Sequence, residues 1–118
     1  MIARDDQLRW EGGQAVFRMP AEIDVTNANQ VREALRSAAR QATSVLIIDM
    51  TATTFCDSAG VQAIVDAYNQ VEARNQNAAA PTQLRLVATA VRRIIQLVGI
   101  DQLIPVYLTL EAALADSG

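Results

Sequence analysis

The first part of the chain alternates hydrophobic and polar residues with a period of two, which predicts a β-hairpin. The alternation covers residues 8–11 and 15–19. Between these segments, Gly12-Gly13 can adopt the positive φ angles that a two-residue turn requires. Pro20 has no N–H group to donate to a sheet, so we expect the second strand to end close to it.

Two longer segments carry an apolar residue every three or four positions, which predicts helices. The first follows the linker Ala21–Thr26, with Asn27 as its expected N-cap, and the second runs from about Ser58 to Arg74. The apolar stripe of the first helix contains Val31, Leu35, Ala38 and Ala42, and that of the second contains Val61, Ile64, Val65, Tyr68 and Val71.

Nearly continuous apolar segments rich in β-branched residues predict buried strands. Val45–Met50 is expected to form the centre of a sheet, with Leu84–Ala88 as the next strand and Ile104–Leu108 as a short last one. The segment Thr51–Cys56 is expected to be a loop in which Phe55 points inward.

Two short helices are expected near the C-terminus. Thr89 can cap the first of them, and Gly99 stands where a left-handed residue would end it. The expected apolar stripe of this helix contains Val91, Ile94, Ile95 and Val98. Thr109 can cap a terminal helix that extends to about Ala115.

Strands separated by helices indicate right-handed crossovers and a mostly parallel sheet. The predicted order is β-β-α-β-α-β-α-β-α, which places the chain in the α/β class. We expect a mixed, mostly parallel sheet of about five strands, with an antiparallel N-terminal hairpin, packed against about four helices. The 118 residues form a single domain in this interpretation, with a core spanning about 8–116.

Composition excludes several classes of function. The chain has no histidine, and all ten of its basic residues are arginine, so imidazole-based catalysis, Schiff-base chemistry and a P-loop lysine are excluded. With 13 acidic residues its net charge is −3, and no basic cluster favours nucleic acid. Residues 1–6 lack a signal pattern, and no apolar run reaches the roughly 20 residues that span a bilayer. We expect a soluble, cytoplasmic protein without a cofactor or metal and without membrane insertion.

Cys56 is the only cysteine, so no internal disulfide can form. One interpretation is a small buried hydrophobic residue, which is how a free cysteine most often behaves. The other is a redox sensor. The buried interpretation is favoured because most free cysteines in folded proteins are simply buried.

The segment Thr53–Val61 is unusual because it follows the central strand and opens a helix, where open α/β sheets place functional residues. Either Asp57 or Ser58 could cap that helix, which is the structural interpretation. The functional interpretation is that Ser58 accepts a phosphate. Ala59 and Gly60 are small and would leave its hydroxyl accessible, and a phosphate at a helix N-terminus would meet free N–H groups. The phosphate adds about −1.5 to −2 charges, which would disfavour a docked partner.

The sequence also resembles the STAS domain family, the fold of bacterial anti-sigma factor antagonists. The resemblance covers roughly residues 8–116 and rests on the apolar central strand together with the segments Ala21–Asp24, Phe55–Val61 and Val91–Ile100. It implies that Ser58 is phosphorylated by an anti-sigma factor that is itself a serine kinase, and dephosphorylated by a PP2C-type phosphatase. The unphosphorylated form would bind the anti-sigma factor and release the sigma factor. Expected partner-binding residues are Asp24, Asp57, Ser58, Ala59, Gly60 and Gln62.

Two alternatives to this function remain. The chain could be a STAS accessory subunit of a membrane transport complex, such as a lipid-transport ATPase, with a nucleotide-binding domain as its partner. A threonine is more usual than Ser58 in that group. A small enzyme is the third possibility, but Asp57 and Ser58 lack a base, and local spacing places no second carboxylate beside them. Neither a sigma factor nor an oligomeric state follows from the sequence.

Overall fold

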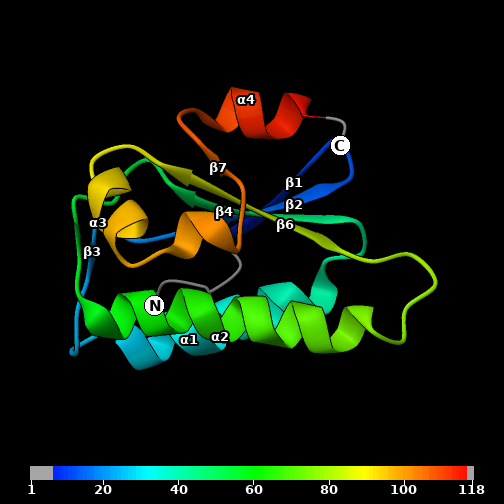
Figure 1. The fold of residues 1–118 in the computed structure, drawn as a ribbon, viewed down its shortest axis with the longest axis horizontal. Helices are drawn as coiled ribbons and strands as arrows, with labels where there is room; N and C mark the ends of the chain where they lie inside the picture. The colour runs from blue at the N-terminus through cyan, green and yellow to red at the C-terminus, as the bar shows by residue number, and fades with distance from the viewer. Residues whose placement is uncertain (1–6, 117–118) are drawn as a thin grey trace.

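The computed structural model describes residues 7–116, so the N-terminal segment 1–6 lies outside the described residues. Figure 1 shows the elements in space. In chain order they are β1 (Leu8–Glu11), β2 (Gln14–Arg18), β3 (Glu22–Ile23), α1 (Ala28–Gln41), β4 (Val45–Met50), β5 (Phe55–Cys56), α2 (Ser58–Asn75), β6 (Gln83–Ala88), α3 (Arg92–Leu97), the 3-10 turn η2 (Ile100–Gln102), β7 (Val106–Tyr107) and α4 (Leu110–Ala115).

The main sheet has five strands in the order β1-β2-β4-β6-β7. β1 and β2 are antiparallel, and every other neighbouring pair is parallel. β4 is the central strand, with Ile47 opposite Val16 on one side and Arg85 on the other, and all six of its residues are buried. This mixed, mostly parallel sheet confirms the predicted α/β class. Except for Asp49, β4 is apolar, as is typical of a strand covered on both faces.

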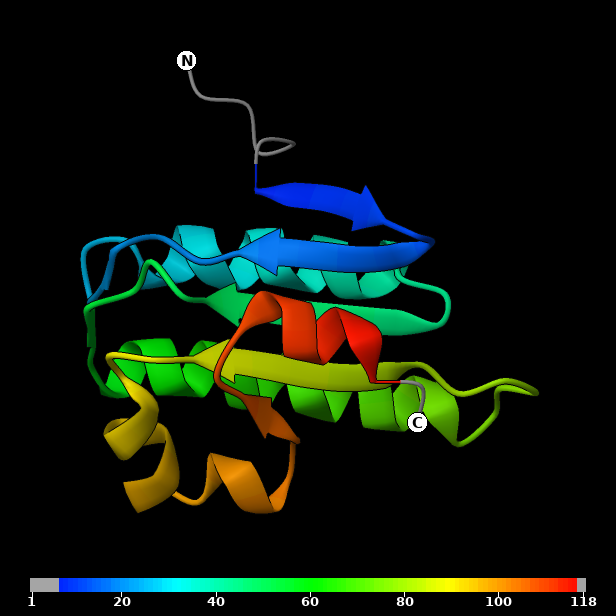
Figure 2. The ribbon, with the colours of Figure 1, turned by 90° about the horizontal axis from the view of Figure 1, so that it is seen from above.

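Helices cover both faces of this sheet. In Figure 1, α1 and α2 lie together on one face and α4 lies on the other. Figure 2 shows α4 over β4 and β6, while α3 and η2 lie beyond the sheet on the β7 side. The larger core lies under α1 and α2 and includes Phe17, Leu35, Ile48 and Ile64. The core under α4 is smaller and is built around Ile47 and Val87. No helix within residues 7–116 is both long and apolar enough to cross a bilayer.

Several local predictions are confirmed. Gly12 and Gly13 have φ angles of 56° and 83°, which are those of the tight hairpin turn, and Gly99 has a φ of 82°. The Thr109 side chain caps α4 by accepting a hydrogen bond from the backbone N–H of Ala112 at 3.1 Å.

Other local predictions are wrong because tertiary contacts override local preference. Thr89 does not cap α3; its hydroxyl donates to the Leu108 carbonyl at 3.3 Å, and α3 begins only at Arg92. The expected stripe of α3 also fails at Val98, which is 52% exposed because the helix ends at Leu97. Asn27 precedes α1 but makes no side-chain capping bond to it.

Arg74 near the end of α2 holds the end of α1. Its guanidinium donates to the carbonyls of Ala39 at 2.6 Å and Ala42 at 3.1 Å, and to the Thr82 hydroxyl at 2.8 Å. The last carbonyls of a helix have no partner within the helix, and the planar fork of arginine can satisfy two of them together. This residue therefore joins α1, α2 and the start of β6.

Replacing Arg74 tests this role. We expect Arg74→Ala to lower the free energy of unfolding by about 1–3 kcal/mol, because the bonds lost are charge-assisted. Arg74→Lys should recover only part of the loss, since an ammonium lacks the fork. Urea denaturation followed by circular dichroism measures both. Arg36→Ala, at an exposed position of α1, is the control; an equal effect there would contradict the assignment.

Candidate functional site

Two segments that the sequence pattern assigned to a linker and a loop pair with each other. β3 and β5 form a short parallel ladder in which Glu22 lies opposite Phe55 and Ile23 opposite Cys56. The backbone N–H of Asp57 extends the ladder by donating to the Ile23 carbonyl at 3.1 Å. This pair lies at the end of the sheet where α2 begins (Figure 1). It decides the position of the first turn of α2.

Gly60 is required by the close approach of that turn to the β3–β5 pair. A Cβ atom at this position would lie 2.5 Å from Cys56 Sγ and 2.8 Å from Ile23 Cγ2, both well inside van der Waals contact. Gly60 is buried, so it packs against its own chain and lies beneath the surface on which we expected it. The absence of a side chain at Gly60 allows the first turn of α2 to pack directly against Cys56 and Ile23.

Asp57 is the residue that caps α2. Its backbone is extended, with φ −95° and ψ −170°, and its Oδ1 accepts hydrogen bonds from the N–H groups of Ala59 at 2.9 Å and Gly60 at 3.3 Å. Of the two capping residues that the sequence left open, the structure selects Asp57. It also corrects one expectation, because these two N–H groups are already occupied and are not free for a phosphate on Ser58.

Ser58 is the first residue of α2 and is exposed. Because Asp57 caps the helix, the Ser58 hydroxyl is not needed for capping, and it makes no hydrogen bond to any of residues 7–116. Ala59 beside it is half-buried and carries only a methyl group. The hydroxyl can therefore be approached from outside the molecule.

Asp24 lies next to Asp57, although the two are far apart in the sequence. Each follows directly after a paired residue of the β3–β5 ladder, Ile23 and Cys56 respectively. Asp24 Oδ1 accepts from the backbone N–H of Thr26 at 2.9 Å and from the Thr26 hydroxyl. These hydrogen bonds hold the pKa of the Asp24 carboxyl below its ordinary value. Asp24 therefore stays ionised near neutral pH and cannot serve as a general acid.

Gln62 lies one helical turn after Ser58, on the same side of α2. It is exposed, and its side-chain amide donates to Asp66 at 3.0 Å. The structure thus brings the exposed parts of Asp24, Asp57, Ser58 and Gln62 to one end of the domain. Gly60 lies behind them.

Two exposed apolar residues lie in the segments that carry Asp24 and Asp57, and the sequence pattern did not predict their exposure. Phe55 is 49% exposed, so the expectation that it points inward is wrong. Successive side chains of a strand point in opposite directions, and because Cys56 is buried, Phe55 must face out. Val25, directly after Asp24, is 78% exposed. The alternation of Phe55 with Cys56 was the available signal, but it has meaning only once that segment is known to be a strand.

Cys56 is buried under the site. Burial, and to a lesser degree the negative charge of Asp57, raise the pKa of its thiol to about 11. The thiolate is therefore scarce at neutral pH, which supports the interpretation of Cys56 as a packed hydrophobic residue rather than a redox sensor.

The chain belongs to the STAS domain family, whose model matches residues 7–113. No curated protein matches the sequence.

Solved structures that are similar to this chain include anti-sigma factor antagonists. One, from Mycobacterium paratuberculosis, is 28% identical, with a TM-score of 0.77 over 91% of this chain and 87% of that chain. SpoIIAA in its unphosphorylated form is 26% identical, with a TM-score of 0.66 over 92% of this chain and 91% of that chain. Bacillus SpoIIAA in its phosphorylated form is 23% identical, with a TM-score of 0.64 over 92% of this chain and 95% of that chain, and shows likeness of fold alone.

The close approach at Gly60 predicts that replacing this glycine with alanine lowers the stability of the protein. In an ordinary helix, Gly→Ala stabilises by about 0.5–1 kcal/mol. Here we expect Gly60→Ala to destabilise by about 1–3 kcal/mol, because the added methyl group overlaps Cys56 and Ile23. Thermal or urea unfolding measures the change. In a Cys56→Ala background the cost should be smaller, and a stabilising Gly60→Ala in the wild-type background would contradict the packing described.

The buried thiol predicts slow chemical modification. With its pKa raised from 9.0 to about 11, the native Cys56 should react with a disulfide reagent at pH 8 at least about 100-fold more slowly than in the urea-unfolded chain. The release of the coloured thiolate from Ellman's reagent measures both rates. Equal rates before and after unfolding would show that the thiol is accessible.

Proposed function

We propose that this protein is an anti-sigma factor antagonist that is switched by phosphorylation of Ser58. In its unphosphorylated form it binds an anti-sigma factor with serine kinase activity, and the sigma factor is released. A PP2C-type phosphatase restores that form. The protein's own role is binding, without catalysis. The family membership and the antagonist structures that share its fold support this proposal.

The exposed hydroxyl of Ser58 is the observation that carries the proposal. A kinase has to bring the γ-phosphate of ATP in line with the oxygen that attacks it, so the acceptor must be accessible. Ser58 is exposed at the start of α2, and the residue after it has only a methyl side chain. Because Asp57 already caps the helix, modification of Ser58 would leave the fold intact.

The charges around Ser58 explain how one phosphate could act as a switch. Asp57 precedes it, and Asp24 directly follows Ile23, whose carbonyl accepts a hydrogen bond from the Asp57 N–H at 3.1 Å. A phosphate adds about −1.5 to −2 charges to this already acidic surface, and the N–H groups of Ala59 and Gly60 already donate to Asp57. Burying such an uncompensated charge under a partner costs several kcal/mol, and about 1.4 kcal/mol is a tenfold change in affinity.

The proposed docking surface combines these acidic groups with the exposed side chains of Phe55 and Val25. A buried aromatic anchor commonly contributes much of the binding energy at an interface, and charged groups around it orient the partner. Phe55 lies two residues before the capping aspartate, and the proposed interface includes both Phe55 and Ser58. The phosphate would therefore fall inside the interface.

Phosphorylation in vitro tests the site directly. We expect incubation with the anti-sigma factor kinase and ATP to add one phosphate, which tandem mass spectrometry places on Ser58. Ser58→Ala should abolish the modification, whereas Ser44→Ala, at an exposed position just before β4, should leave it unchanged. Equal labelling of the Ser58→Ala variant would disprove the site.

Binding to the anti-sigma factor tests the switch. The phosphorylated protein should bind at least about tenfold more weakly than the unmodified protein, because the added charge is uncompensated at the interface. Isothermal titration calorimetry measures both affinities, and equal thermal unfolding temperatures would show that the fold is unchanged. Equal affinities would refute the charge mechanism. Binding instead to the nucleotide-binding subunit of a transport complex would favour the accessory-subunit alternative.

A further inference from the structure

One edge of the sheet is left partly uncovered. β7 pairs with β6 only at Leu86 and Val87, and the Leu86 N–H donates to the Pro105 carbonyl at 3.0 Å. In a parallel ladder of this register, the next bond would run from the nitrogen of residue 105 to the Leu84 carbonyl. Residue 105 is proline and has no N–H group. The ladder therefore stops, and no strand within residues 7–116 covers this side of Gln83–Arg85.

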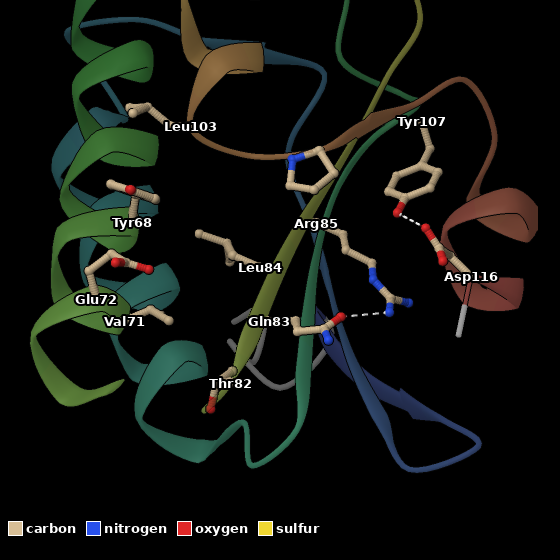
Figure 3. A pocket seen from close by; sticks show the side chains of 11 residues that line it. Tyr68, Val71, Glu72, Thr82, Gln83, Leu84, Arg85, Leu103, Tyr107 and Asp116 are labelled. Carbon is tan, nitrogen blue, oxygen red and sulfur yellow. Dashed lines mark hydrogen bonds between the residues drawn. The ribbon is translucent and has the colours of Figure 1, made fainter. Parts of the chain in front are cut away.

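A cavity of about 380 Å³ opens along this uncovered edge. Its walls come from both faces of the sheet, as Figure 3 shows: side chains of α2 and Leu103 lie on one side, and Arg85, Tyr107 and Asp116 on the other. The side chains of an added strand would alternate between these two walls, and its backbone would meet the free groups of Leu84. The cavity thus has the position and the two-sided form that an extended peptide requires.

The α2 wall presents an apolar position followed by an acidic one. Tyr68 is half-buried, with Leu103 near it in the cavity, and Glu72 is exposed one turn later. Four residues of helix rise about 6 Å and two residues of strand about 6.6 Å, so alternate residues of an added strand would fall opposite Tyr68 and Glu72.

The charges of the two walls differ. Glu72 takes part in no ion pair with any of residues 7–116. On the other wall, the buried guanidinium of Arg85 is engaged by the Ala113 carbonyl at 2.7 Å and by the side-chain oxygen of Gln83 at 2.8 Å. Tyr107 donates to Asp116 on that wall. The available charge is therefore the carboxylate of Glu72, which favours a basic residue in the occupant.

We propose that the open edge of β6 binds an extended segment of a partner protein, in which an apolar residue stands two positions from an arginine or lysine. The segment adds a strand to β6 beyond the end of β7. Its apolar side chain packs between Tyr68 and Leu103, and its basic side chain pairs with Glu72. This surface lies along the C-terminal half of α2, more than two turns from Ser58, so both surfaces can be occupied in one complex.

A designed peptide provides the probe. Fluorescein-labelled Thr-Arg-Thr-Leu-Thr-Arg-Thr carries a basic residue two positions from leucine in both directions, so it fits whichever way the added strand runs. We expect saturable binding by fluorescence anisotropy. The same peptide with glutamate in place of both arginines should bind at least about fivefold more weakly, because it is repelled by Glu72.

Backbone methylation distinguishes strand addition from simple insertion of a side chain. Only alternate backbone groups of an added strand face β6. Two methylated peptides are compared: one carries N-methyl groups on the leucine and both arginines, and the other carries them on the two inner threonines. One of these peptides should bind about tenfold or more weakly than the unmodified peptide, and the other should bind equally well. An equal effect of both sets, or no effect of either, would overturn the proposal.

Protein variants locate the site. Glu72→Arg should weaken binding of the probe about fivefold or more, and Glu33→Arg, at an exposed position of α1, should leave it unchanged; thermal unfolding should be the same for both. Ser58→Asp should bind the probe like wild type, so failure of the phosphorylation switch would not affect this test. Equal binding by Glu72→Arg, or self-association of the chain through this edge in sedimentation experiments, would overturn the assignment to a partner peptide.

Discussion

The close contact between the first turn of α2 and the β3–β5 pair is the constraint on which the site depends. Only glycine fits at position 60, because a side chain there would overlap Cys56 and Ile23. With the helix held this close, Asp57 lies where its carboxylate can reach two N–H groups of the first turn. The side chain of Ser58, the first residue of α2, is therefore not used for capping. The exposure of its hydroxyl is a consequence of packing beneath it.

The same arrangement determines the electrostatics. Parallel pairing of β3 with β5 brings Asp24 beside Asp57, and the pKa of Asp24 is lowered by hydrogen bonds from Thr26. A new negative charge at Ser58 would stand directly after the carboxylate of Asp57 in the chain, which is the physical basis of the proposed switch.

Helix α2 contributes to both the surface at Ser58 and the cavity at the edge of β6. Its N-terminus carries Ser58, and its C-terminal half lines the cavity at the edge of β6. The first surface is acidic and surrounded by exposed apolar residues, whereas the second offers backbone groups of Leu84 together with one carboxylate. These chemistries suit different partners. The two proposed contacts would thus lie at opposite ends of one helix.

Local patterns in the sequence determined the fold class, the hairpin, the central strand and the segment that contains Ser58. Each depends on periodicity or on backbone preferences of residues close in the chain, such as the glycines of the hairpin turn and the nearly continuous apolar run of β4. Tertiary structure alone decided the β3–β5 pairing, and with it the outward direction of Phe55 and the position of Asp24. It also decided that Asp57 rather than Ser58 caps α2. Contacts between segments some 30 residues apart depend on how the whole core packs, and no local pattern records them.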